Sequence, residues 1–484
     1  MGNYSKKKFK SKNNNRNETI ELSDNRLYTS LFFVLGILCI LAAIVLSPNM
    51  GYDLDHLFMV ATGRDIINNG ITHINNMTWL KDLEAVYEQW LYDIISYGVY
   101  RCVGKASSVV MCIINLVVLF IPIYKLARLR NNQEKSFFIS GLMFLFLFAY
   151  ISPRPAILTV ALLMWQFYIC EAQKNMWWIP LLVLLETNVH SAYTIFHFVY
   201  LLPYIVPGIT KWLQDEHDLK YLKIIPAMIA AAFCNPYGIK GALFLFYTYP
   251  SISKLSIIEL QTIDFANLKL DTIMTIVICI IITVMLAFRI KKGVPSPAFY
   301  IFIGSVTMLI MIPVYKNLIF LPIGCLPIIS FLFKDIKRAR NYIIEVSLAI
   351  IIMIPMIFNT IPDKVNSFDD IYPSKIMEYL REVKPKRLFT AYDVGAMVEF
   401  AGMKCFVDNR PELYIKSIND KYDYINDHDK VIFGTDVDRT RIAEKYKFDY
   451  YLVNENLIEY FRSWANKKCE LIIEDKNLFL YKYK

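Results

Sequence analysis

The sequence predicts a polytopic α-helical membrane protein that ends in a small α/β domain. Hydrophobic residues make up 56% of the 484 residues, whereas charged residues make up 20%. The apolar residues gather in runs of about 16 to 22, close to the length of a helix that crosses a bilayer. A water-soluble protein of this length cannot bury that many apolar runs in its core. Soluble, disordered, collagen-like and disulfide-stabilised classes are therefore excluded.

The first 26 residues are polar and basic, with a cluster of lysines at positions 6 to 12. We expect residues 1–26 to be a disordered cytoplasmic tail. The apolar run that begins at Leu27 is not followed by a small-residue cleavage site. It is therefore interpreted as an uncleaved first span and not as a signal peptide.

About eleven apolar runs are predicted to form a transmembrane domain over residues 27–361. Their ranges are 28–48, 106–126, 137–152, 155–171, 177–189, 191–209, 223–236, 271–290, 297–314, 318–333 and 342–360. Alternate junctions between these runs carry most of the lysine and arginine residues. The positive-inside rule places those junctions and the N-terminus in the cytoplasm, and the C-terminal tail outside. The net charge of +9 follows from this topology and does not indicate nucleic-acid binding.

Two further segments are too long to be turns. The first outer loop, residues 49–105, contains amphipathic patterns near 56–69 and 84–103 that suit helices lying along the membrane surface. The tail, residues 362–484, alternates a helix pattern with short strand patterns. The helix is expected at 374–382, and the strands at 387–391, 404–408, 448–453, 469–473 and 478–482. This alternation predicts a small extracytoplasmic α/β domain with some parallel pairing.

Asp53 and Asp55 directly follow the first span, at the outer surface. On an extended segment, carboxylates two residues apart point to the same side, where they can chelate a divalent cation such as Mg²⁺ or Mn²⁺. A carboxylate in a low-dielectric surrounding is also a better base than one in open water. Asp53 and Asp55 are therefore the catalytic and metal-binding candidates. The alternative is a pair of solvated loop acids.

Other polar residues interrupt apolar segments or lie at outer turns, and they are candidates for substrate binding: His56, Glu88, Arg154, His190, Asn235, Lys316, Asp408 and Arg410. Ionisable groups at such positions are costly and usually face a cavity or one another. Arg154, His190, Asn235 and the Asp408-Arg410 pair also have structural alternatives: a loop arginine, a packing histidine, a turn and a loop salt bridge, respectively. The predicted topology brings all of them to the outer side.

Several classes of site are not supported. The histidines show no HExxH spacing, and the nine cysteines contain no CxxC pair and lie mostly inside apolar runs. There is also no P-loop, GxSxG or GxGxxG pattern, so ATP-driven transport and serine hydrolysis have no basis in the sequence.

Seven short stretches, in this order and spacing, resemble the GT-C superfamily of membrane glycosyltransferases, and in particular uncharacterised bacterial multi-pass proteins. They are Asp53-Leu-Asp55, Ala61-Thr-Gly-Arg64, Glu88-Gln-Trp-Leu91, Arg154-Pro155, Asn188-Val-His190, Asn235-Pro-Tyr-Gly238 and Asp408-Asn-Arg410. The resemblance adds Arg64 to the substrate-binding candidates. One departure is Met59, where such relatives often have His.

The resemblance implies transfer of a sugar from a polyprenyl-phosphate or polyprenyl-diphosphate donor to a cell-envelope glycan, lipid or protein at the outer face of the plasma membrane. We expect the sugar carbon to be attacked with inversion. Asp53 would be the general base, and Asp55 would position the acceptor or a divalent cation. Arg154, His190 and Lys316 would stabilise the departing phosphate. Two other readings stay open: a transporter or flippase of a lipid-linked substrate, and an inactive envelope scaffold.

Overall fold

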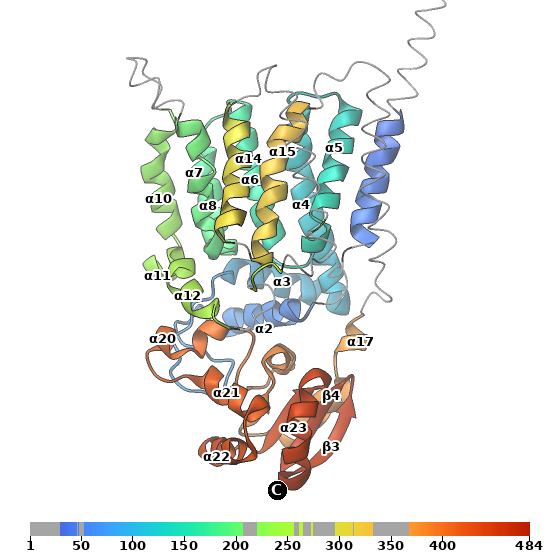
Figure 1. The fold of residues 1–484 in the computed structure, drawn as a ribbon, viewed down its shortest axis with the longest axis vertical. Coiled ribbons are helices and arrows are strands. Elements are labelled where there is room, and N and C mark those ends of the chain that lie inside the picture. The colour runs from blue at the N-terminus through green and yellow to red at the C-terminus, as the bar shows by residue number, and fades with distance from the viewer. Residues whose placement is uncertain are drawn as a thin grey trace, which may run out of the picture.

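A computed structural model describes residues 30–45, 47, 53–206, 220–255, 261–264, 273, 296–312, 314–332 and 367–484. An upper group of roughly parallel helices, a middle layer of helices and loops, and a lower α/β domain follow one another along the longest axis (Figure 1). The predicted tail 1–26 and the predicted spans 271–290 and 342–360 lie outside the described residues, apart from Ile273.

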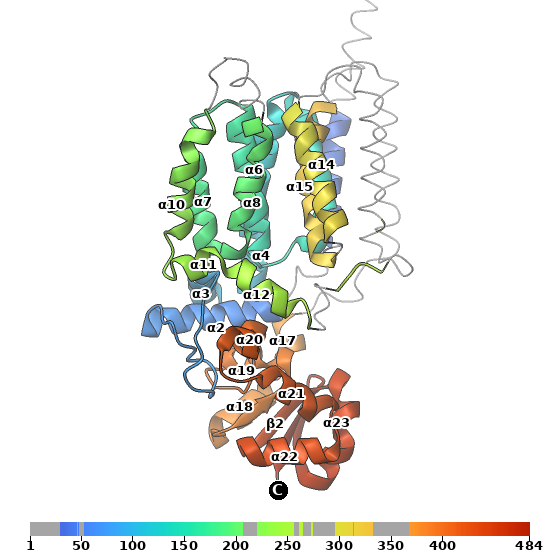
Figure 2. The ribbon, with the colours of Figure 1, turned by 60° about the vertical axis from the view of Figure 1, so that its left-hand side comes forward.

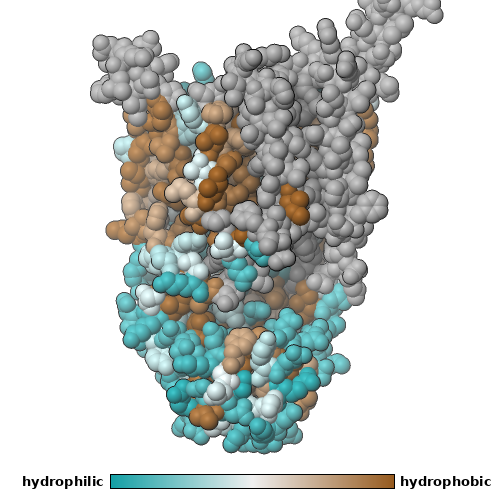
Figure 3. Space-filling model, in the orientation of Figure 1, coloured by the Kyte–Doolittle hydropathy of each residue, from teal (hydrophilic) through white to brown (hydrophobic). Residues whose placement is uncertain are grey.

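The upper group consists of apolar helices. Its members are Ser30–Val45, α4 (Ser107–Arg128), α5 (Gln133–Phe146), α6 (Ala156–Glu171), α7 (Trp178–Val189), α8 (Thr194–Val199), α10 (Ile225–Phe233), α14 (Ser296–Met311) and α15 (Phe320–Leu332). Short 3-10 turns adjoin several of them: η2 (Phe148–Tyr150), η3 (Ser191–Tyr193), η4 (Leu222–Ile224) and η7 (Tyr315–Ile319). Brown, hydrophobic side chains face outward over this group, whereas the lower domain is mostly teal (Figure 3).

The prediction of a polytopic protein with about eleven membrane-crossing helices is wrong for the part of the chain that the structure describes. Within it, one helical stretch, Trp90–Arg128, is long and apolar enough to cross a membrane, with 39 residues and a mean hydropathy of 2.5 in its most apolar window. The other apolar helices contain 10–17 residues. A 16-residue helix rises about 24 Å, which is less than the about 30 Å of a hydrocarbon core. The apolar runs counted in the sequence include residues that form turns, so they overstate helix length.

The middle layer contains α2 (Leu54–Asn69) and α3 (Trp90–Val103), which leads through η1 (Gly104–Ala106) into α4. Two short helices, α11 (Ile239–Ala242) and α12 (Phe244–Ile252), lie beside them (Figure 2). The helix α2 crosses beneath the ends of the upper helices, and it is buried at every position from His56 to Gly63. It is therefore enclosed between two layers, whereas the sequence predicted a helix lying on a membrane surface.

Helices α2 and α3 approach each other at Gly63. A Cβ atom at this position would lie 2.1 Å from the carbonyl oxygen of Asp93. Since no side chain fits in that space, glycine is required for the two helices to pack at this distance. This contact places the N-terminal end of α2 and its aspartates relative to α3.

The lower domain contains a four-stranded mixed sheet in the order β1-β2-β4-β3. The strands are β1 (Leu388–Thr390), β2 (Tyr450–Asn454), β3 (Cys469–Asp475) and β4 (Leu478–Tyr483), with β1 parallel to β2 and the other pairs antiparallel. Its helices are α17 (Phe368–Ile371), α18 (Ser374–Val383), α19 (Gly395–Phe400), α20 (Lys416–Asn419), α21 (Tyr424–Phe433), α22 (Asp436–Tyr446) and α23 (Glu455–Lys468), with 3-10 turns η8 (Tyr392–Val394) and η9 (Pro411–Leu413). The strand predicted at 404–408 is not formed, because Cys405 makes only an isolated bridge with Thr78.

The first outer loop and the lower domain share one hydrophobic core. Side chains of α2, such as Leu57 and Phe58, belong to the same buried cluster as Phe389 and Phe406 of the lower domain. Trp79 stacks on Phe406 with a 5.2 Å centroid distance and donates from its Nε1 to the carbonyl oxygen of Leu388 at 3.0 Å. Segments separated by about 300 residues therefore pack as one unit.

Candidate active site

The candidate site begins at the N-terminal end of α2. Asp53 is the N-cap residue of this helix, with an extended backbone, and its Oδ1 accepts a hydrogen bond from the backbone N–H of Asp55 at 3.1 Å. An aspartate at an N-cap satisfies an otherwise unpaired helix N–H, and this fixes its side chain. The predicted Asp53 and Asp55 therefore have a defined orientation that follows from the local sequence.

Arg154 joins the two carboxylates. Its Nε lies 2.6 Å from Oδ2 of Asp53, its Nη2 lies 3.1 Å from Oδ1 of Asp53, and its Nη1 lies 2.8 Å from Oδ2 of Asp55. The Asp53 side chain is 7% exposed, whereas the Asp55 side chain is 32% exposed. The guanidinium therefore clamps both acids, and Asp55 is the more accessible of the two.

The turn that carries Arg154 is held by polar groups of α3 and α4. Asn115 of α4 donates from Nδ2 to the carbonyl oxygens of Ser152 and Arg154, each at 3.1 Å. Tyr92 of α3 donates from its hydroxyl to the carbonyl oxygen of Pro153 at 2.8 Å. Because three backbone carbonyls of the turn are bonded, Arg154 is presented to the aspartates by a fixed backbone.

The lower domain contributes Asn409 to the same cluster. Its Nδ2 donates to Oδ1 of Asp55 at 2.7 Å. The flanking residues, Asp408 and Arg410, were the predicted site residues, and their side chains do not make this contact in the structure. Asn409 lies in a bend in which Oδ1 of Asp408 accepts from the backbone N–H of Arg410 at 2.9 Å, so the side chains of Asp408 and Arg410 pair inside the domain while Asn409 faces the aspartates.

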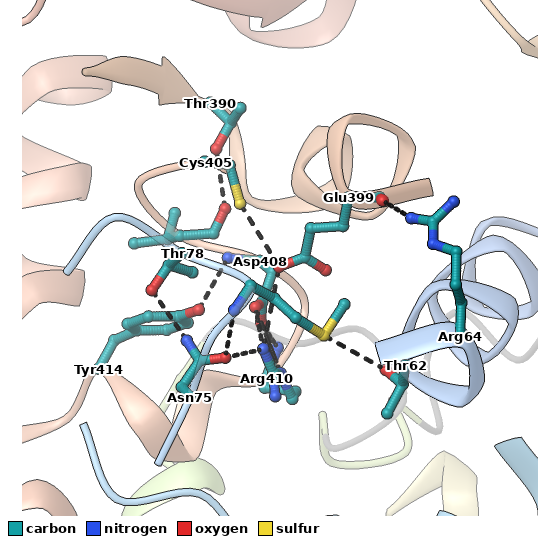
Figure 4. A network of polar contacts seen from close by, with 12 residues as sticks. Thr62, Arg64, Asn75, Thr78, Thr390, Glu399, Cys405, Asp408, Arg410 and Tyr414 are labelled. Atoms are coloured by element: carbon teal, nitrogen blue, oxygen red, sulfur yellow. Dashed lines mark hydrogen bonds and ion pairs between the residues drawn. The ribbon is translucent and has the colours of Figure 1, made fainter. Parts of the chain in front are cut away.

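Asp408 and Arg410 form a buried ion pair within the lower domain, and Arg410 also bonds Asn75 of the first outer loop (Figure 4). The Nη2 of Arg410 donates to Oδ2 of Asp408 at 2.6 Å and to Oδ1 of Asn75 at 2.9 Å. Burial by itself would raise the pKa of Asp408, but the Arg410 charge and hydrogen bonds lower it below its ordinary value. Burial raises the pKa of the adjacent Glu399 well above its ordinary value, and the charge of Asp408 adds to this shift. Burial and the Arg410 charge therefore shift the pKa values of the two neighbouring acids in opposite directions.

Three other predicted binding residues, His56, Arg64 and Asn235, have partners within the protein that stabilise its structure. His56 is fully buried, with its Nε2 2.8 Å from the Ser107 hydroxyl, and burial lowers its pKa to about 4. Arg64 donates to the carbonyl oxygens of Glu399 at 2.6 Å and Phe400 at 2.9 Å, at the C-terminal end of α19. A cation is favourable at a helix C-terminus, so Arg64 docks α19 onto α2.

Asn235 stabilises its own turn. Its Oδ1 accepts from the backbone N–H of Tyr237 at 2.9 Å, and its Nδ2 donates to the carbonyl oxygen of Gly238 at 3.0 Å. Gly238 has a φ of +55°, which glycine adopts without strain. In the sequence, a structural turn was the alternative to a binding role for Asn235. The structure shows that turn.

His190, Lys316 and Glu88 form a second polar group. His190 is the C-cap of α7, and its ring contacts that of Tyr193 in a tilted arrangement with a centroid distance of 4.4 Å. The Lys316 ammonium lies 5.8 Å from the centroid of the same Tyr193 ring. Burial raises the pKa of Glu88, and the Lys316 charge partly offsets the rise. The carbonyl oxygen of Glu88 accepts from the backbone N–H of Ser191 at 3.0 Å, which ties the first outer loop to the end of α7.

Glu412, in η9 of the lower domain, was not predicted from the sequence. Burial raises its pKa to about 8, and the negative charges of Glu88 and Asp408 contribute to the rise while Arg410 opposes it. Tyr392 of η8 interacts electrostatically with both Glu412 and Asp55. The lower domain therefore faces both the Asp53-Asp55 cluster and the group of His190, Lys316 and Glu88. At neutral pH the Glu412 carboxyl group is mostly protonated.

The structure brings together Asp53, Asp55 and Arg154, and separately His190, Lys316 and Glu88. Reasoning from the sequence missed Asn409, Asn115, Tyr92 and Glu412. Asn115 was detectable, because it is an amide inside the predicted span 106–126 and such a group needs a polar partner. Asn409 was also detectable, since it alternates with two residues that were themselves predicted.

The site does not have the ligands that the predicted divalent cation requires. Among the described residues, no group of three or more His, Cys, Asp or Glu side chains is arranged to hold a metal ion. Asp53 and Asp55 share Arg154, a cation that already lies against both carboxylates. The donor set of this site therefore does not fit Mg²⁺ or Mn²⁺, which prefer several oxygen ligands around one ion.

No protein-family model matches this sequence, and no curated protein matches it. Solved structures do. The chain is similar to the oligosaccharyltransferase of Archaeoglobus fulgidus in its apo form, with a TM-score of 0.63 at 10% identity, over 94% of this chain and 74% of that one. The same enzyme, named AglB, in complex with an inhibitory peptide and a dolichol-phosphate gives 0.62 at 11% identity, over the same shares of the two chains.

A third structure is that oligosaccharyltransferase tethered to an acceptor peptide, with a TM-score of 0.58 at 11% identity over the same shares of both chains. At this identity, the similarity concerns the fold. The chain therefore shares the fold of that archaeal enzyme.

Proposed function

We propose that this protein is a glycosyltransferase that transfers a sugar from a lipid-linked donor to an acceptor at a membrane surface. The observation that carries the proposal is the cluster of Asp53, Asp55 and Arg154 at the boundary between an apolar helical group and a polar domain. The fold supports it, because the similar archaeal enzyme has been solved with a dolichol-phosphate and with an acceptor peptide. A fold alone does not set a reaction, so the site carries the argument.

The donor that fits this arrangement is a polyprenyl-phosphate-linked sugar. Large apolar side chains of the upper helices are exposed, with Ile310 at 73% and Met311 at 76%. Extended exposed apolar surface is typical of contact with lipid or a partner. We place the protein at the plasma membrane, with the N-terminus cytoplasmic and the lower domain on the outer side. Because nucleotide sugars are cytoplasmic, a sugar used outside must arrive on a lipid carrier.

In the reaction we propose, an acceptor hydroxyl attacks the anomeric carbon of the sugar with inversion. The bond from that carbon to the phosphate oxygen breaks, the lipid phosphate leaves, and the acceptor proton passes to a carboxylate. The sequence assigned the base to Asp53. The structure favours Asp55 for this step, because its side chain is 32% exposed while that of Asp53 is 7% exposed and accepts three N–H groups.

The leaving phosphate is assigned to the second polar group. Lys316 supplies a positive charge beside Tyr193, and His190 supplies a ring whose Nδ1 lies 3.0 Å from the Thr159 hydroxyl. A positive charge held in place at a developing phosphate lowers the barrier most where water is excluded. The acceptor is a cell-envelope glycan, lipid or protein, and identifying the product decides between them.

The test uses the purified full chain in proteoliposomes with a lipid extract that contains polyprenyl-linked sugars, and mass analysis of the products. We expect Asp55→Asn to lower transfer by about 10²- to 10⁴-fold, the usual size of a general-base effect, without a change in thermal unfolding. The matched control is Asp65→Asn, on the same helix, where the carboxylate accepts from the Asn69 amide. Full transfer by Asp55→Asn, or movement of lipid-linked sugar across the bilayer without covalent change, would refute the proposal.

A further inference from the structure

Each oxygen of the Asp53 and Asp55 carboxylates has at least one nitrogen donor of the protein as a partner. Oδ1 of Asp53 accepts from the backbone N–H of Asp55 at 3.1 Å and from Nη2 of Arg154 at 3.1 Å, and Oδ2 of Asp53 accepts from Nε of Arg154 at 2.6 Å. Oδ2 of Asp55 pairs with Nη1 of Arg154 at 2.8 Å, and Oδ1 of Asp55 accepts from Nδ2 of Asn409 at 2.7 Å. All four carboxylate oxygens therefore face N–H groups of the protein.

These donors are held in place by separate parts of the chain. Asn115 and Tyr92 fix the turn of Arg154, the N-cap geometry fixes Asp53, and the docked lower domain supplies Asn409. A guanidinium bound in this forked manner is a permanent cation, because arginine keeps its proton at any accessible pH. A divalent ion at the same oxygens would have to lie next to that charge, and repulsion between like charges opposes this.

We infer that Arg154 is the resident cation of this site, because it occupies the place between Asp53 and Asp55 that a divalent ion would take. Asn409 of the lower domain donates to the remaining oxygen, Oδ1 of Asp55. The site is thus a metal-independent acid pair that is complete only when the lower domain is docked. The inference rests on the proposed function for its catalytic meaning. It is tested by metal binding to the chain and by thermal unfolding of the chain.

The first measurement is Mn²⁺ binding to the wild-type chain in detergent, followed by electron paramagnetic resonance. We expect no stoichiometric binding at 100 μM Mn²⁺ and no change in the unfolding temperature when 1 mM Mn²⁺ or EDTA is added. One bound Mn²⁺ per chain that is lost in Asp53→Asn would overturn the inference. That outcome would leave lipid-linked sugar transfer standing, so the two failures are distinguishable.

The second measurement uses Arg154→Gln, which keeps a polar side chain and removes the charge. Two carboxylates then lack their cation, so we expect a lower unfolding temperature that 1 mM Mn²⁺ or a pH of 5 partly restores. The matched control is Arg101→Gln, an exposed arginine of α3, which should respond to neither condition. An unchanged unfolding temperature in Arg154→Gln would refute the inference, and if this variant does not fold, the wild-type titration still decides.

Discussion

Replacing Arg410 with methionine separates a structural from a substrate-binding role for the Asp408-Arg410 pair. Methionine has a similar length and keeps the apolar contacts, but it leaves Asp408 and Glu399 without their cation. Both acids are almost completely buried, at 0% and 2% exposure. Removing one partner of a buried ion pair costs about 3 to 5 kcal/mol, because the remaining charge is neither paired nor solvated. At about 2 to 4 °C per kcal/mol, the unfolding temperature should fall by about 6 to 20 °C.

The assay is thermal unfolding of the full chain, followed by tryptophan fluorescence, since Trp79 and Trp464 lie in the core shared with the lower domain. The matched control is Arg441→Met. Arg441 pairs with Asp438 at 2.8 Å, but its side chain is 64% exposed, so its loss should cost less than about 1 kcal/mol. The double variant Asp408→Asn with Arg410→Met should recover part of the loss, because it removes the unpaired charge.

Two results would refute this reasoning. If Arg410→Met unfolds at the temperature of Arg441→Met, the ion pair does not hold the domain in place. If Arg410→Met keeps its stability but loses sugar transfer, the side chain binds substrate, as the sequence suggested. A variant that is less stable, yet transfers sugar at low temperature, supports the structural role.

Gly63→Ala should destabilise the fold by more than about 1 kcal/mol in urea unfolding, because its Cβ would lie 2.1 Å from the Asp93 carbonyl oxygen. The control is Gly98→Ala, which has no neighbouring atom within 4 Å of its Cβ and should be neutral or slightly stabilising. Equal effects of the two substitutions would contradict the close packing of α2 and α3. Glu412 has a folded pKa raised to about 8 from 4.5, so its contribution to stability is complete below pH 4.5 and is lost as the pH rises through 8, at up to about 1.4 kcal/mol per pH unit. Unfolding temperatures between pH 5 and 9 should therefore fall more steeply for the wild type than for Glu412→Gln, and superimposable profiles would show that this acid titrates normally.

The helices of the upper group were located by their apolar runs, but their lengths were not. Residue 189 ends α7 where the sequence placed a break between two spans, whereas the run at 223–236 gives a helical stretch of only Leu222–Phe233. Hydropathy reports which residues avoid water, and it does not report where the backbone leaves the helix. Within the described ranges, the number of long membrane-crossing helices was therefore overestimated.

The sequence by itself named Asp53, Asp55 and Arg154, because charged side chains beside apolar runs need partners and are few enough to be considered together. Their mutual contact, and the approach of Asn409 from a position 354 residues beyond Asp55, were decided by tertiary packing. The reason is geometric. A pattern of residue types records local preferences for burial and conformation. A contact between distant segments depends instead on how the shared core orients α2 against the lower domain.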